Sequence, residues 1–307
     1  MAISGQADQA DRQKNRYELR NRYVFKGKLV MQTALHIGGG RVTLSSSDSP
    51  VVLTPEQKPY IPGSSFKGAL RSTVEKLVPG LPSFSSCALI ELSDEEIRAL
   101  GRDRKAIREI CPTVRQGEIA QRRRREPDRA AEIQREALED LCDTCLLFGS
   151  PFAAARLNVN DLYMPKEEWS GVLQIRDGVA IDRDSEKAKD RLKYDFEVVP
   201  ASATFDMEIV LENATKRDVQ LLCVGLSEFV HGFGVIGGKR SRGLGVAQLD
   251  DLRVSALELF SEGVDEIEVG EEERRRRLRT YLVNKEFSRN FPEGADFLEE
   301  YINSIFV

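Results

Sequence analysis

Two glycine-rich, basic elements constrain this chain most, because each adjoins a stretch whose apolar residues have helical spacing. The first covers residues 62–71 (PGSSFKGALR) and the second covers residues 237–245 (GGKRSRGLG). Glycine lets a backbone come close to a ligand, while Lys and Arg supply charge and donors that match phosphate oxygens. We therefore expect a phosphodiester backbone, and hence a nucleic acid, as ligand. The alternatives are a helix with a solvated basic face and a flexible connection.

The order of the apolar patterns predicts the fold. Helical spacing indicates two helices, over 64–77 and 219–230, and alternation indicates strands at 23–35, 153–162, 205–211 and 246–254. This order of strand, helix, strand, strand, helix, strand is that of an α+β, ferredoxin-like (RRM-like) βαββαβ core. Ser64 is expected to cap the first helix, and residues 171–199 to form a thumb-like hairpin arm that turns at Asp177-Gly178.

Three further segments complete the expected domain organisation. We expect an N-terminal arm over 1–22, one core domain over 23–254 with a charged, cysteine-containing insertion at about 80–150, and a helical C-terminal extension over 255–307. In that extension, three glutamates precede a run of arginines, which is the order that the dipole of a helix favours.

Composition limits the classes of function. The net charge of −5 is unlike that of a generic nucleic-acid binder, so binding requires a local basic patch. The polar start of the chain does not resemble a secretory signal, and no apolar run is long enough to span a bilayer. Five cysteines, an odd number, favour thiol or metal chemistry in a reducing compartment over disulfides. We expect a cytoplasmic protein without membrane contacts.

Four of the cysteines lie within the insertion or at its end. Cys142 and Cys145 form a Cys-x-x-Cys pair, and Cys87 and Cys111 bring the number of thiols to the four that a closed structural zinc site needs. A charged insertion with little apolar content needs such a staple in order to fold. The alternative is two unrelated buried thiols and a chance pair. Cys223 fits the apolar face of the second helix.

Four motifs carry a resemblance to a known family. They are residues 35–39 (LHIGG), 48–51 (DSPV), 60–68 (YIPGSSFKG) and 237–243 (GGKRSRG). In this order, they resemble the RAMP superfamily of CRISPR-associated proteins, and within it the backbone subunit of type III effector complexes. Residues 142–150 (CDTCLLFGS) and 176–182 (RDGVAID) are most similar to subunits of the type III-D branch. The resemblance runs from about residue 24 to 254.

The resemblance implies partners and RNA contacts. The partners would be guide CRISPR RNA, target RNA, other RAMP subunits and the large signalling subunit, in antiviral defence. The arm would insert between guide and target, with Ile175, Val179 and Ile181 as candidate wedges. The implied RNA-binding residues are His36, Gly63, Ser64, Ser65, Lys67, Arg71, Arg176, Arg183, Gly237, Gly238, Lys239, Arg240, Ser241 and Arg242.

The resemblance also places Asp48 where cleaving members carry the aspartate required for cutting target RNA. One carboxylate can hold a partly hydrated Mg²⁺ or similar ion only when RNA phosphates supply further ligands. The alternative is a loop Asp that caps its own turn. Two other functions stay open: a structural RNA-binding subunit without catalysis, and a guide-processing endoribonuclease that uses His36. Packing or phosphate contact is the simpler role for His36.

Overall fold

The computed structural model of this chain describes residues 18–39, 47–89, 93, 95–96, 110–165, 167–169, 171–181, 188–260 and 269–307. Residues 180–181 and 188–193 are described by their backbone alone. Most of the expected N-terminal arm lies outside these residues. The first strand in them begins at Asn21, two residues before the expected start of the core. In the part of the chain that is described, no helix is both long and apolar enough to cross a bilayer.

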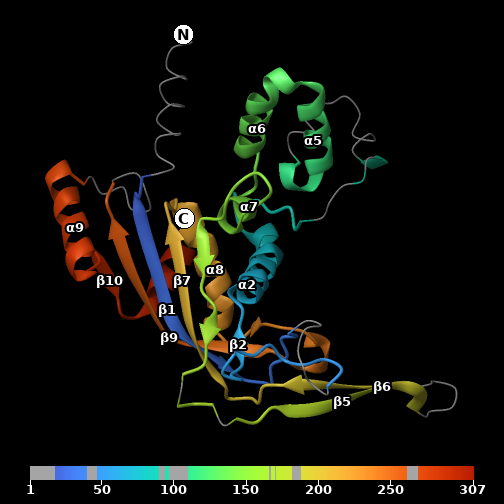
Figure 1. Ribbon diagram of the computed structural model, residues 1–307. Coiled ribbons are helices and arrows are strands. Elements are labelled where there is room, and N and C mark those ends of the chain that lie inside the picture. Colours follow the sequence, from blue (N-terminus) through green and yellow to red (C-terminus); the bar gives the residue numbers. More distant parts are fainter. Residues whose placement is uncertain are drawn as a thin grey trace.

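An antiparallel sheet organises the chain (Figure 1). Its strands run in the order β10-β9-β1-β7-β4-β2, while β3 also pairs with β7 and β8 pairs with β9. The central strand β1 is hydrogen-bonded along most of its length to β7 on one side and to β9 on the other. The strands of this sheet are β1 (Asn21–Met31), β2 (Tyr60–Ile61), β3 (Leu157–Val159), β4 (Leu162–Tyr163), β7 (Thr204–Glu212), β8 (Gly234–Val235), β9 (Val246–Glu258) and β10 (Arg289–Phe291).

Three helices pack together beside this sheet: α2 (Gly63–Leu77), α8 (Lys216–Val230) and α10 (Gly294–Asn303). Four residues, Phe66, Leu70, Val74 and Leu77, form the predicted stripe on α2. The first three are fully buried in the main core, whereas Leu77 is half-buried. The ring centroids of Phe66 and Phe229, on α2 and α8, lie 5.1 Å apart. A Thr215–Asp218 capping box begins α8. The core therefore lies between these helices and the sheet.

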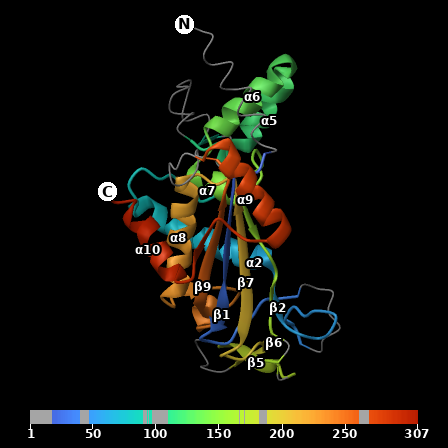
Figure 2. The same ribbon diagram turned by 90° about the vertical axis from the view of Figure 1, so that its left-hand side faces the viewer.

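Two additions extend from opposite ends of the core, as both ribbon views show (Figure 1, Figure 2). The insertion carries α5 (Gln116–Arg125), α6 (Ala130–Glu139) and α7 (Asp143–Phe148), and α7 lies against α2 and α8. At the other end, β5 (Gln174–Ile181) and β6 (Ala188–Val198) form a separate two-stranded hairpin, the arm. The insertion and the arm are thus separate additions to the sheet and its helices.

Three local predictions are wrong. Ser64 does not cap α2: the helix begins at Gly63, and the N–H of Gly63 donates to Asp161 Oδ1 at 2.7 Å. Asp177-Gly178 is not a turn, because both residues are paired within the arm, and Gly178 lies under the ring of Tyr194. The strand expected over 153–162 is two short strands, β3 and β4, which pair with β7 at different places.

The C-terminal extension contains two helices, as expected, and also the unpredicted edge strand β10. Helix α9 (Glu271–Asn284) lies beside the sheet and contains no buried residue. By contrast, α10 belongs to the main core through Phe297, which is 2% exposed and has its ring centroid 4.5 Å from that of Tyr301 and 5.9 Å from that of Phe25. The end of this chain is therefore part of the folding unit.

Candidate functional site

The second glycine-rich loop folds back onto the end of the segment that follows β1. Gly237 has a φ of +83°, and a Cβ atom there would lie 2.5 Å from the carbonyl oxygen of His36. The N–H of Gly238 donates to that same oxygen at 2.9 Å. At Gly245, with a φ of +86°, a Cβ would lie 1.9 Å from the carbonyl oxygen of Ile236. Only glycine tolerates such close approaches at positive φ, which explains the composition of this loop.

Two cations of this loop, Lys239 and Arg242, lie over aromatic rings at the root of the arm. The Nζ of Lys239 is 4.4 Å from the ring centroid of Phe196 and 5.3 Å from that of Tyr194. The guanidinium carbon of Arg242 lies 5.4 Å from the Tyr194 centroid, and Arg240 donates from Nε to the carbonyl of Gly237 at 3.0 Å. Such contacts orient a cation without neutralising its charge, so it stays available to an anion.

His36 is buried at the same place, with 6% exposure. Its Nδ1 lies 2.7 Å from the carbonyl oxygen of Glu197, and its Nε2 lies 3.2 Å from Ser49 Oγ. Burial lowers the pKa of His36, and the charge of Lys239 lowers it further, against a smaller opposing effect of the hydrogen bond to Glu197. The imidazole is therefore held neutral and packed on Phe196, with both ring nitrogens in hydrogen bonds.

Asp48 lies exposed on the loop beside His36 and exchanges hydrogen bonds with Asp195 of β6. The N–H of Asp48 and the hydroxyl of Ser47 both donate to Asp195 Oδ1 at 2.8 Å. In return, the N–H of Asp195 donates to Asp48 Oδ2 at 3.1 Å. Sequence reasoning missed Asp195, because 147 residues separate it from Asp48 and no motif marks it.

In the first glycine-rich element, the cation Lys67 contacts the protein backbone. Gly63 is packed so tightly that a Cβ there would lie 2.2 Å from the carbonyl oxygen of Val159, whereas Ser64 is exposed and Ser65 is half-buried. Half-buried Lys67 donates from Nζ to the carbonyl of Leu157 at 2.9 Å, and burial lowers its pKa. The exposed hydroxyls at the start of α2 remain available to a ligand, while Lys67 contacts the protein itself.

Arg71, one helical turn further along α2, contacts the insertion. Its Nη1 donates to the carbonyl of Gly149 at 2.9 Å, its Nη2 lies 3.4 Å from Cys145 Sγ, and its Nε pairs with Glu75 at 2.8 Å. The side chain is only 13% exposed. The structure therefore places this predicted phosphate contact against a thiol and a backbone carbonyl.

The four predicted cysteines converge in space. The Sγ atoms of Cys87, Cys111, Cys142 and Cys145 lie within 4.8 Å of one another, none is in a disulfide, and three of the residues are buried. Cys145 Sγ is 3.5 Å from that of Cys87 and 3.9 Å from that of Cys111. Tetrahedral Zn–S bonds of about 2.3 Å place sulfur atoms about 3.8 Å apart. The donor set and its spacing therefore fit a tetrahedral thiolate-bound metal ion.

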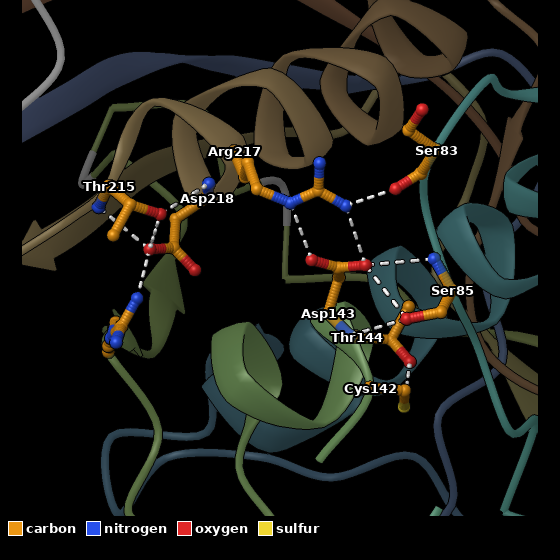
Figure 3. Close-up of polar contacts among 9 residues, drawn as sticks. Ser83, Ser85, Cys142, Asp143, Thr144, Thr215, Arg217 and Asp218 are labelled. Atoms are coloured by element: carbon orange, nitrogen blue, oxygen red, sulfur yellow. Dashed lines mark hydrogen bonds and ion pairs between the residues drawn. The ribbon is translucent and has the colours of Figure 1, made fainter. Parts of the chain in front are cut away.

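A polar network joins this cluster to helix α8 (Figure 3). Asp143, beside Cys142, accepts from Arg217 Nε at 2.8 Å and Nη2 at 2.9 Å, and from the N–H and hydroxyl of Ser85 at 2.8 Å. Arg217 also donates to the carbonyl of Ser83, and its guanidinium carbon lies 4.2 Å from the ring centroid of Phe84. The entry and exit of the insertion are thus tied to the same helix.

The arm presents apolar and basic side chains to solvent. Ile175 is 60% exposed and Val179 is 47% exposed, and Arg176 between them is exposed as well. The predicted contact Arg183, and the side chain of the predicted wedge Ile181, lie outside what the structure describes. The described residues among those predicted thus fall into three groups: one in the arm and at its root, one at the start of α2, and one where α2 meets the insertion.

Comparison with known proteins identifies relatives. The model of the RAMP superfamily matches residues 28–248. Three similar proteins are each named CRISPR system Cms endoribonuclease Csm3. One from Methanocaldococcus jannaschii is 24% identical over 256 residues, 77% of this chain and 82% of the relative. One from Enterococcus italicus is 50% identical over 60 residues, 18% of this chain and 28% of the relative. One from Methanothermobacter thermautotrophicus is 41% identical over 56 residues, 17% of this chain and 23% of the relative. The chain thus matches about a quarter of the length of the last two.

Proposed function

Because this chain belongs to the RAMP superfamily, we propose that it is a guide-RNA-binding backbone subunit of a type III CRISPR ribonucleoprotein. One observation carries the proposal: Lys239 and Arg242 of the glycine-rich loop, His36 and the Asp48 loop all contact residues 194–197 at the root of the arm. A site with cations, close-approach glycines and a neighbouring carboxylate is suited to a phosphodiester backbone.

The proposed core is ferredoxin-like. In that fold the strands lie in the spatial order fourth, first, third, second, with every neighbour antiparallel. The observed order β9-β1-β7-β3 supports this assignment, with α2 and α8 as the two crossover helices. The motifs at residues 142–150 and 176–182 support a relation to the type III-D branch. The proposed partners are guide RNA, target RNA, other RAMP subunits and the large signalling subunit, acting in antiviral defence in the cytoplasm.

In this proposal, guide RNA lies along the second glycine-rich loop and the exposed start of α2. Lys239 and Arg242 contact phosphates, and Ser64 and Ser65 offer hydroxyl donors at the positive end of the α2 dipole. Glycines at 237 and 238 let the RNA backbone approach. We assign Arg71 a supporting role, because its donors already contact Gly149, Cys145 and Glu75.

We further propose that Asp48 supports cutting of base-paired target RNA. Attack by the 2′-hydroxyl on the adjacent phosphorus forms a 2′,3′-cyclic phosphate and expels the 5′-oxygen, which leaves as a hydroxyl after it accepts a proton. A divalent ion such as Mg²⁺, bound beside the exposed carboxylate of Asp48 and by RNA phosphates, would supply positive charge for the transition state. The names of the three relatives, each an endoribonuclease, support this assignment.

Two alternatives make different predictions. A structural subunit without catalysis would bind guide RNA in the same way and leave cutting to another protein. A guide-processing nuclease would need His36 as a general base, yet its ring nitrogens already contact Glu197 and Ser49, and its ring is buried. The contacts of His36 therefore favour packing over catalysis.

The cysteine cluster is proposed to hold one structural Zn²⁺. Four thiolates leave no position open for a substrate, so the ion would stabilise the insertion rather than take part in a reaction. Thr113 donates to Cys145 at 3.2 Å and Thr144 contacts Cys142 at 3.2 Å, which would orient these two ligands.

The experiment that tests the function compares wild type with Asp48→Ala in the ribonucleoprotein reconstituted with guide RNA and Mg²⁺. Asp250→Ala, an exposed aspartate on β9, is the matched control. Cuts in target RNA should disappear only in the Asp48 variant, while guide and target binding persist. Persistence of every cut would assign cutting to a neighbouring subunit. If the wild-type chain does not bind guide RNA, the RNA-binding assignment is refuted.

A further inference from the structure

We infer that Asp195 is the positioning residue for Asp48, through which the root of the arm fixes the loop that carries the candidate catalytic carboxylate. The inference rests on the proposed cutting function and extends it to a residue outside the recognised motifs. It assigns no direct contact with RNA or metal to Asp195.

The first support is the reciprocal pair itself. Asp195 Oδ1 accepts two hydrogen bonds from the loop, from the N–H of Asp48 and from the hydroxyl of Ser47, both at 2.8 Å. The backbone N–H of Asp195 then holds Asp48 Oδ2 at 3.1 Å. One residue of β6 therefore fixes both the backbone and the carboxylate of Asp48, which restricts the direction in which the other carboxylate oxygen points.

The second support is that the next residues of β6 continue the same attachment. The N–H of Glu197 donates to the carbonyl of Ser49 at 3.1 Å, and Glu197 Oε2 accepts from the N–H of Val51 at 3.0 Å. Further on, Val199 forms a bridge with Leu35, with hydrogen bonds of 2.8 and 2.9 Å. The 47–51 loop is thus attached to the root of the arm at several points, through Asp195 and Glu197.

The third support is that the same root carries the RNA-facing cations. Tyr194 and Phe196, on either side of Asp195, lie under Lys239 and Arg242. A shift of β6 on RNA binding would therefore move the cation platform and the Asp48 loop together. A charged acceptor that holds two donors is a strong attachment, so its loss should release the loop.

The test compares Asp195→Ala, Asp195→Asn and the control Asp250→Ala in two measurements. The first is hydrogen–deuterium exchange of residues 47–51 in the purified chain. The second is target cutting by the reconstituted ribonucleoprotein, with kcat and KM determined separately. Asparagine keeps an Oδ1 acceptor for both donors but removes the charge, so it separates positioning from charge.

We expect Asp195→Ala to accelerate exchange in the 47–51 loop and to lower kcat by about tenfold to a hundredfold, with KM and guide binding unchanged. Asp195→Asn should have an exchange rate in the 47–51 loop and a kcat close to those of wild type. Equal losses in the Ala and Asn variants would overturn the inference, because they would make the charge of Asp195 essential in its own right. Unchanged exchange in Asp195→Ala would also overturn it.

Failure of the proposed function gives a different pattern. If Asp48→Ala cuts target RNA as wild type does, cutting belongs to another protein, and the kinetic measurement carries no information on Asp195. The hydrogen-exchange measurement still decides whether Asp195 holds the 47–51 loop, because this measurement requires no catalysis.

Discussion

Replacing Cys145 tests the cysteine cluster most directly, because this residue is fully buried and its Sγ contacts those of two other ligands at 3.5 and 3.9 Å. Cys145→Ser removes one of four thiolates and leaves an incomplete tetrahedral site. Serine is nearly isosteric with cysteine, so the substitution changes the ligand set with little change in packing.

The magnitude follows from the small apolar content of the insertion. Outside the main core, the described part of the insertion has two small buried clusters, one of Ile119, Ile133 and Ala137 and one of Leu141 with Cys111, Cys142 and Cys145. If the cysteines bind a metal ion as proposed, that ion supplies much of the local stability. At a free metal concentration of about 1,000 times the dissociation constant, a bound ion stabilises the folded form by about 4.1 kcal/mol. Loss of the site should lower the free energy of unfolding of the insertion by about that amount.

The assay measures metal content per chain by mass spectrometry after dialysis, together with hydrogen exchange in residues 110–140. Wild type should retain one ion per chain, and Cys145→Ser should retain almost none and exchange faster in this segment. Cys223→Ala is the matched control, because this thiol is fully buried in the main core away from the cluster. The Cys223→Ala variant should retain one metal ion per chain. One ion per chain in Cys145→Ser, or none in wild type, would refute the reasoning.

The remaining predictions concern stability. Phe297→Ala should lower the free energy of unfolding by about 3–5 kcal/mol in urea denaturation, because a 2% exposed ring in the aromatic core is removed. The control Phe306→Ala, at a 62% exposed position, should change it by less than about 0.5 kcal/mol, and equal effects would place α10 outside the core. Burial lowers the pKa of His36, so the unfolded chain binds a proton at this residue more readily than the folded chain does. The neutral ring therefore contributes its full stabilisation only above the ordinary pKa of 6.5. The stability difference between wild type and His36→Asn should therefore shrink as the pH falls below that value, and a pH-independent difference would contradict the assignment.

Local patterns predicted the elements that bury their own apolar stripe. The stripe of Phe66, Leu70 and Val74 indicated α2, and alternation indicated β7, because each pattern reflects contact with one core. The cysteine cluster was predictable for a different reason: four thiols in or beside a charged insertion have few other uses. Membership of the RAMP superfamily followed from the motifs and is confirmed by the family match.

The failures came from contacts between residues distant in the sequence. Ser64 has the right chemistry for a cap, but the carboxylate of Asp161 reaches the first N–H of the helix. Gly178 resembled a turn glycine, yet it is small because the ring of Tyr194 lies over it. Neither partner adjoins its residue in the sequence, so no local pattern reveals the contact.

The contact between Ser85 and Asp143 has a consequence for protein engineering. Hydrogen bonds of 2.8 Å join the point where the chain leaves the core to the point where it returns, so the intervening 86–142 segment begins and ends at one place. A loop closed in this way can be exchanged at little cost in chain entropy. A short linker between these two positions, or a fluorescent domain in place of the segment, would leave the sheet and the arm undisturbed. The insertion is therefore a natural attachment point for a reporter.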